Sequence, residues 1–68
     1  MYRVLLFYKH GYDYHEETTD SLCSAEDYYY HIVNEMEYEG CPVYMIVMYF
    51  DKMKIKEFRT KKEVMYVQ

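Results

Sequence analysis

An unbroken apolar run occupies residues 43–50, where the chain is Val-Tyr-Met-Ile-Val-Met-Tyr-Phe. Eight such residues have the length and composition of a buried strand. We therefore expect this run to be the central strand of a sheet, covered on both faces. At 68 residues the chain is long enough for a single domain, residues 1–68, so the other elements must pack around this strand.

Two further strands are predicted beside this run. Residues 2–8 are aromatic and branched and contain no breaker, which is typical of a strand buried on at least one face. After an Asp-Lys turn, residues 53–56 alternate apolar and cationic side chains, as a half-exposed antiparallel strand does. Residues 43–59 should therefore form a hairpin, and residues 64–67 are candidates for a final edge strand.

A helix is predicted to begin at Ser24. The segment Ser24-Ala-Glu-Asp27 has the capping-box pattern, in which the serine hydroxyl accepts from amides of the first turn and the acid returns the bond. Gly40 supplies a left-handed stop, and Pro42 prevents continuation. Apolar side chains recur at intervals of three and four residues and should face the sheet: Ala25, Tyr28 or Tyr29, Ile32, Val33 and Met36.

These elements predict an α+β fold. If residues 2–8, the helix and residues 43–50 form a right-handed crossover, the two strands are parallel and the helix covers one face of the sheet. The expected architecture is a small mixed β-sheet of three to four strands packed under one α-helix. Residues 12–20, which follow the first strand, fit either a short extra strand or a long loop.

Charge is segregated along the chain. Between His10 and Phe50 there are nine carboxylates and no lysine or arginine, whereas six of the eight basic residues lie between Lys52 and Lys62. The acidic part also holds eight of the eleven tyrosines, and aromatic side chains beside carboxylates are suited to anchoring on a basic protein surface. Three consecutive helical tyrosines cannot all face the core, so Tyr30 should be exposed. We expect an acidic, tyrosine-bearing surface to bind a partner through Glu26, Asp27, Tyr30, Glu35, Glu37, Tyr38 and Glu39.

The charge also bears on the class of partner. A net charge of −4 argues against direct binding of nucleic acid, because phosphate binding requires a basic face that releases counterions. No apolar stretch reaches the ~20 residues needed to cross a bilayer, and the amino terminus lacks a basic region followed by a small-residue cleavage site. We therefore expect a cytoplasmic protein whose partner is another protein.

Histidine and cysteine side chains give one candidate metal site. His10, His15 and Cys23 flank or lie within the connection between the first strand and the helix, and with a fourth ligand from His31 or Asp20 they would hold zinc tetrahedrally. Zinc would stabilise so small a core, because metal affinity becomes folding free energy. The alternative is that no cofactor binds, with Cys23 a buried apolar group and the histidines on a hydrated loop.

Catalysis is not expected. A reactive thiol needs nearby positive charge, and Cys23 lies in the most acidic segment of the chain. A chain of this length also has little room for an enclosed pocket of about 300 Å³ or more. Cys41 should not form a disulfide with Cys23, because a helix of about 16 residues would separate their Cα atoms by roughly 24 Å and a disulfide needs about 7 Å or less.

In size, acidity, aromatic content and lack of a catalytic motif, the whole chain resembles the small proteins with which phages and mobile elements disable host enzymes. These include anti-CRISPR proteins and inhibitors of uracil-DNA glycosylase, and the resemblance is one of class. It implies a stoichiometric inhibitor of a nucleic-acid-handling host protein, with a CRISPR nuclease as one candidate. As a DNA mimic, the protein would replace phosphates by carboxylates and stacked bases by tyrosines in a basic groove of its partner.

Two other classes of protein fit the same sequence. One is a zinc-stabilised structural or regulatory interaction module whose partner is not a nucleic-acid enzyme. The other is a small homo-oligomer, such as a homodimer, that pairs through an exposed final strand. Metal analysis distinguishes the first class from the inhibitor, and light scattering distinguishes the second.

Overall fold

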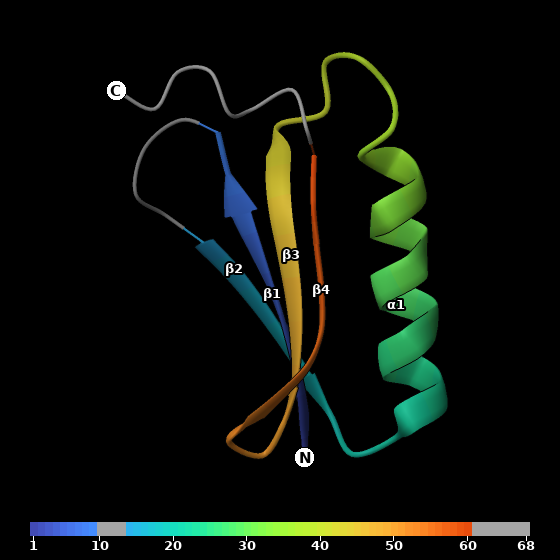
Figure 1. The fold of residues 1–68 in the computed structure, drawn as a ribbon. Helices are drawn as coiled ribbons and strands as arrows, with labels where there is room; N and C mark the ends of the chain where they lie inside the picture. The colour runs from blue at the N-terminus through green and yellow to red at the C-terminus, as the bar shows by residue number, and fades with distance from the viewer. Residues whose placement is uncertain (10–13, 61–68) are drawn as a thin grey trace.

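The computed structural model describes residues 1–9 and 14–60 (Figure 1). Four strands and one helix follow one another along these residues: β1 (Tyr2–Tyr8), β2 (Tyr14–Thr19), α1 (Leu22–Glu35), β3 (Val43–Phe50) and β4 (Met53–Arg59). The predicted α+β class is confirmed, as are the first strand and the hairpin at residues 43–59. The candidate strand at residues 64–67 lies outside the described residues. In the described part of the chain, no helix has the length and apolar character needed to cross a membrane.

The strands form one sheet in the order β2-β1-β3-β4, and each described pairing is antiparallel. The predicted parallel pairing of β1 with β3, and with it the mixed sheet, is therefore wrong. The reason is that residues 14–19 form a strand. Because β2 reverses the direction of the chain, α1 connects β2 to β3, and β1 runs in the opposite direction between these two strands.

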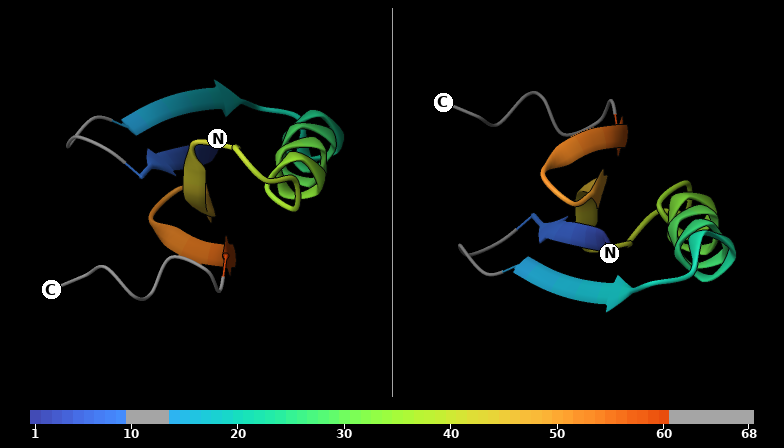
Figure 2. Two further views of the ribbon diagram at one scale, coloured as in Figure 1. Left: turned by 90° about the horizontal axis from the view of Figure 1, so that it is seen from above. Right: turned by 90° about the horizontal axis from the view of Figure 1, so that it is seen from below.

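The helix packs on one face of the sheet, as two views from the ends of the molecule show (Figure 2). The register places Leu6 of β1 between His15 of β2 and Ile46 of β3, so alternate side chains of each strand point toward α1. A core cluster fills the space between this face and the helix: Val4, Leu6, Ala25, Tyr29, Met36, Val43, Ile46 and Met48. The predicted stripe of the helix is confirmed, since its members either belong to this core or pack against it.

The opposite face of the sheet carries no helix in the described residues, so the expected cover on both faces of β3 is present on one face only. Polar and aromatic groups lie on this open face instead. The guanidinium carbon of Arg3 is 5.2 Å from the centre of the Tyr49 ring, and Nε of Arg3 is 3.3 Å from a carboxylate oxygen of Glu16. A cation–π contact and an ion pair thus take the place of a second layer over this part of the sheet.

Tyr29, which is buried in the core, makes the stability of the fold sensitive to alkaline pH. Burial raises its pKa above the ordinary value of 10.0, and the charges of Tyr30 and Glu57 raise it further. The folded protein holds this proton more tightly than the unfolded chain does, and this difference stabilises the fold. The stabilisation is complete below the ordinary pKa of tyrosine and is lost as the pH rises through the raised pKa of Tyr29. Tyr29→Phe should therefore lose less stability than the wild type between neutral and strongly alkaline pH.

Urea unfolding at a series of pH values measures this difference. Tyr38→Phe is the matched control, because the Tyr38 side chain is exposed, and its stability should follow that of the wild type. A Tyr29→Phe curve that runs parallel to the wild-type curve at every pH would contradict the prediction.

The N-cap of α1 lies three residues earlier than the capping-box pattern predicts. Ser21 has an extended backbone, and its hydroxyl accepts a hydrogen bond from the amide of Ser24 at 3.2 Å. Ser24 therefore lies in the first turn and donates the bond. At the other end Met36 is the C-cap, and Gly40, with a φ of +90°, belongs to the connection with β3 and does not end the helix.

Replacing Ser21 by alanine should lower the free energy of unfolding by about 1 kcal/mol, because the amide of Ser24 loses its acceptor. The matched variant Ser24→Ala should not be destabilised, since alanine is the better helix former at an exposed position inside a helix. Urea unfolding followed by circular dichroism measures both variants. Equal losses, or a larger loss in Ser24→Ala, would contradict the assignment of Ser21 as the cap.

The predicted turn between β3 and β4 is confirmed at Asp51 and Lys52. Asp51 adopts a left-handed φ of 54°, and its carboxylate lies 3.1 Å from the amino terminus at Met1. This turn, the amino terminus and the start of α1 lie at one end of the molecule, whereas the connection from α1 to β3 lies at the other (Figure 1).

Candidate functional site

Acidic side chains gather where α1 ends and the chain turns toward β3. We call this surface the acidic end; it consists of Glu35, Glu37, Tyr38 and Glu39. Met36 is buried in the core and anchors the connection, so its neighbours project outward, and Tyr38 is 71% exposed. Backbone hydrogen bonds fix this turn, because the amide of Tyr38 donates to the carbonyl of Glu35 at 3.1 Å and the amide of Cys41 donates to the carbonyl of Tyr38 at 3.3 Å.

Two carboxylates of the acidic end, those of Glu35 and Glu37, lie at an electrostatically unfavourable position beside α1. The carboxyl end of a helix carries partial negative charge, so carboxylates are repelled there and cations are attracted. Glu35 is the last residue of α1, and Glu37 follows two residues later, while the last turn of α1, all of it described, holds no basic residue. Local arrangements that the fold itself does not favour are typical of functional surfaces.

Helix geometry divides the predicted anionic surface. Glu26 and Glu35 are nine residues apart, which places them about 180° apart around the axis. Glu26 and Tyr30 lie toward β4, where Nζ of Lys56 is 5.5 Å from the centre of the Tyr30 ring. A hydrogen bond with Tyr30 raises the pKa of Lys56, and the charge of Glu26 adds to this effect. Tyr30 is exposed, as predicted, but its ring already contacts a cation of the same chain.

The structure thus brings together four of the seven residues predicted to bind a partner. These four form the acidic end. Asp27 is exposed on the outer side of α1, where its carboxylate accepts from the Cys23 thiol across 4.0 Å. Glu26 and Tyr30 interact with Lys56 of β4. The sequence pattern of the helix does not reveal this contact.

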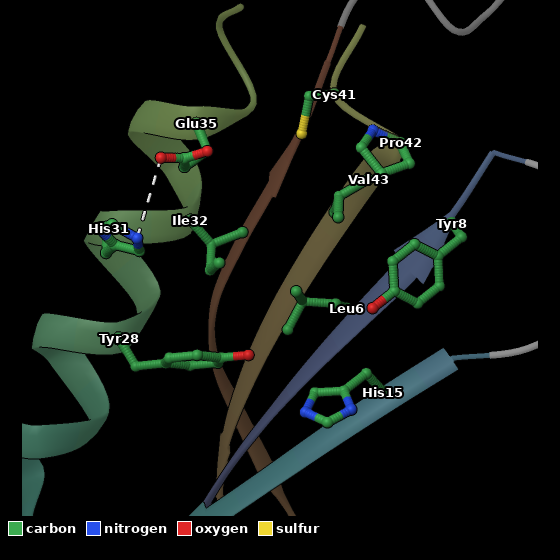
Figure 3. A pocket seen from close by; sticks show the side chains of 10 residues that line it. All are labelled: Leu6, Tyr8, His15, Tyr28, His31, Ile32, Glu35, Cys41, Pro42 and Val43. Carbon is green, nitrogen blue, oxygen red and sulfur yellow. Dashed lines mark ion pairs between the residues drawn. The ribbon is translucent and has the colours of Figure 1, made fainter.

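A cavity of about 430 Å³ lies between α1 and the sheet, beside the acidic end (Figure 3). Its lining comes from three strands, the helix and the α1–β3 connection: Leu6, Tyr8, His15, Tyr28, His31, Ile32, Glu35, Cys41, Pro42 and Val43. The sequence predicted little room for an enclosed pocket of this size, whereas the structure forms a cavity that is open to solvent. The sequence did not reveal it, because only the antiparallel register of β2 places His15 beside Leu6.

Two contacts between a histidine and a carboxylate border the cavity. Nε2 of His31 lies 3.9 Å from Oε2 of Glu35 on α1, and Nε2 of His15 lies 2.6 Å from Oε2 of Glu17 on β2. Burial raises the pKa of Tyr28, and the charge of Glu17 raises it further. The carboxylate of Glu17 on β2 is therefore close enough to the hydroxyl of Tyr28 on α1 to make its ionisation less favourable.

The described residues do not assemble the predicted zinc ligands. His10 lies outside them. His15 borders the cavity together with Tyr28, whereas Cys23 precedes Tyr28 by five residues and points about 140° away from it around the helix. Cys23 is an exposed free thiol, so the expectation that it is a buried apolar group is wrong. In the part of the chain that the structure describes, no three histidine, cysteine or acidic side chains are grouped so as to hold a metal ion.

The acidic end and the cavity share Glu35 and meet at the carboxyl end of α1. Together they present carboxylates, aromatic rings and histidines, and carboxylates and aromatic rings are groups that interact favourably with cations. Comparisons with protein-family models, with curated proteins and with solved structures find no match to this chain.

Proposed function

We propose that this protein is a stoichiometric inhibitor that binds a nucleic-acid-handling host protein through the acidic end. A CRISPR effector nuclease is the first candidate for the partner, because its guide and target occupy positively charged channels. The inhibitor acts in the cytoplasm and needs no cofactor. The observation that carries the proposal is the pair of carboxylates, Glu35 and Glu37, at the negative end of α1, whose last turn, all of it described, holds no basic residue.

The acidic end offers the partner a substitute for nucleic acid. Glu37 and Glu39 present carboxylates on an exposed turn, as successive phosphates present charge along a backbone. The ring of Tyr38 lies between them in sequence and is exposed, so that it can stack as a base does. Cations from the partner also relieve the repulsion between the helix dipole and the carboxylates of Glu35 and Glu37.

The remaining predicted residues contribute less to binding in this proposal. Asp27 faces solvent on the outer side of α1 and adds to the negative field over the helix. Glu26 and Tyr30 lie beside Lys56, which lowers the negative potential of their flank. We therefore expect neutralisation of Glu26 to weaken binding less than neutralisation of Glu37.

A cleavage assay with purified CRISPR effector nucleases tests the proposal. Each nuclease, loaded with its guide, is titrated with the protein at low and at high salt, and the amount that stops cleavage is determined. Inhibition should be complete near one copy of the protein per nuclease and should weaken as salt rises. The double variant Glu37→Gln with Glu39→Gln should lose most of this inhibition.

A matched control separates a local effect from the loss of net charge. Asp20→Asn with Asp51→Asn removes two carboxylates at the opposite end of the molecule and should inhibit as the wild type does. Equal weakening by the two double variants would show that net charge alone matters. Inhibition that is insensitive to salt and to both variants, or none of any nuclease in the panel, would overturn the proposal.

A further inference from the structure

We propose that the cavity beside the acidic end binds the side chain of an arginine from the partner. The inference rests on the proposed function, since it assigns to the cavity a specific part of a basic partner surface. Three features of the cavity carry it: aromatic and apolar walls, the carboxylate of Glu35 at one edge with that of Glu17 nearby, and the position of the cavity next to the acidic end.

The walls fit the shape of an arginine side chain. Figure 3 shows the ring of Tyr28 projecting from α1 toward the sheet and that of Tyr8 on β1, with Leu6 between the two rings. Ile32 also lines the cavity, from α1. Apolar side chains can cover the three methylene groups of arginine, and the face of a tyrosine ring attracts a guanidinium. At about 430 Å³ the cavity exceeds the size needed for one such side chain.

The charges at the edges favour a cation. Glu35 lines the cavity on the side of α1, and Glu17 on β2 lies near enough to raise the pKa of Tyr28. Among the described residues that line the cavity there is no lysine or arginine. The contact between Glu35 and His31 is long, at 3.9 Å, so a guanidinium that binds Glu35 through two hydrogen bonds displaces only a weak interaction.

The position of the cavity couples it to the acidic end. Glu35 belongs to both, and Cys41 and Pro42 of the cavity follow directly after the turn that carries Tyr38. A basic segment of the partner that lies on the acidic end can therefore insert one side chain into the cavity. Arginine fits better than lysine, because its planar guanidinium both stacks on a ring and binds a carboxylate through two donors.

An NMR titration of the purified protein tests this inference without the partner. The probe is N-acetyl-L-arginine N-methylamide, and the same derivative of citrulline serves as the uncharged control of equal shape. The arginine probe should shift the signals of His15, His31 and Tyr28 in a saturable way, and the citrulline probe should not. Glu35→Gln should weaken the affinity for the arginine probe about tenfold, whereas Asp20→Asn, which removes an exposed carboxylate at the other end of the molecule, should leave it unchanged.

Each contrary outcome would overturn the inference. These outcomes are equal shifts with citrulline, shifts that do not saturate or do not involve the cavity, and an affinity that Glu35→Gln leaves intact. The proposed function fails separately, in the cleavage assay. If Glu37→Gln with Glu39→Gln abolishes inhibition while no arginine binds to the cavity, the acidic end is the binding surface and the cavity is not part of it.

Discussion

Ile46→Ala is expected to leave a large part of the protein unfolded at room temperature. Ile46 is the centre of the core, with 0% of its surface exposed, and it lies between Leu6 of β1 and Phe58 of β4 under the helix. Truncation of a buried isoleucine to alanine costs about 2–5 kcal/mol, because apolar contacts are lost and a cavity remains. A domain of this size has a total stability of only about 3–5 kcal/mol, so the loss is comparable to the whole.

Ile55→Ala is the matched control for this variant. The same atoms are removed from a residue of the neighbouring strand β4 that is 40% exposed, and the loss should stay below about 1 kcal/mol. Urea unfolding followed by far-ultraviolet circular dichroism gives both free energies, and the near-ultraviolet signal of the tyrosines reports the packing of the core. A loss in Ile46→Ala no greater than that in Ile55→Ala would contradict the position of Ile46 in a tightly packed core.

The elements that the sequence predicted correctly are those that depend on local patterns. The apolar run at residues 43–50 is the interior strand β3, and the intervals of three and four residues along α1 identify the side that faces the sheet. The turn at Asp51 and Lys52 follows from the change between an apolar and an alternating pattern. Each of these signals lies within a few residues, where propensity and side-chain periodicity decide the structure.

The direction of the strands and the start of the helix were not predicted correctly, the first because it depends on long-range pairing and the second because two local signals compete. The segment that forms β2 is mostly exposed, and its side chains show no alternation of apolar and polar residues. It is a strand because its backbone pairs with β1, and side-chain periodicity gives no sign of this pairing. With β2 in place, β1 and β3 must be antiparallel. Ser21 and Ser24 both stand before the apolar positions of the helix, so either could be its N-cap. The N-cap is Ser21, whose hydroxyl accepts a hydrogen bond from the amide of Ser24.

The binding role of the acidic end stays a prediction. The sequence groups its four residues, because its carboxylates and tyrosine are close neighbours in the chain. It did not identify the contact between Lys56 and Tyr30 or the lining of the cavity, because these depend on how β4 and β2 lie beside α1. A single sequence contains no signal for such long-range pairs, and the helical wheel alone would have separated Glu26 from Glu35.

Tyr38→Ala should weaken binding of the inhibited nuclease about 30-fold, which makes it the largest effect of a single substitution on the proposed function. Exposed tyrosines that become buried at the centre of an interface commonly contribute about 2 kcal/mol or more, and Tyr38 is the most exposed of the large apolar side chains that the structure describes, at 71%. For the same reason the substitution should change the stability of the free protein by no more than about 0.5 kcal/mol. Anisotropy of the labelled protein, titrated with the nuclease, measures the affinity.

Two further variants define what Tyr38 contributes. Tyr38→Phe keeps the ring and should retain most of the affinity if stacking is the source of the effect, whereas a loss equal to that of Tyr38→Ala would assign the effect to the hydroxyl. Tyr14→Ala removes a tyrosine that is 54% exposed on the edge strand β2, where its ring contacts Phe7 on the face of the sheet opposite α1, and this variant should bind as the wild type does. If Tyr14→Ala and Tyr38→Ala weaken binding equally, the tyrosines act through a general property of the surface, and the acidic end is not the centre of the interface.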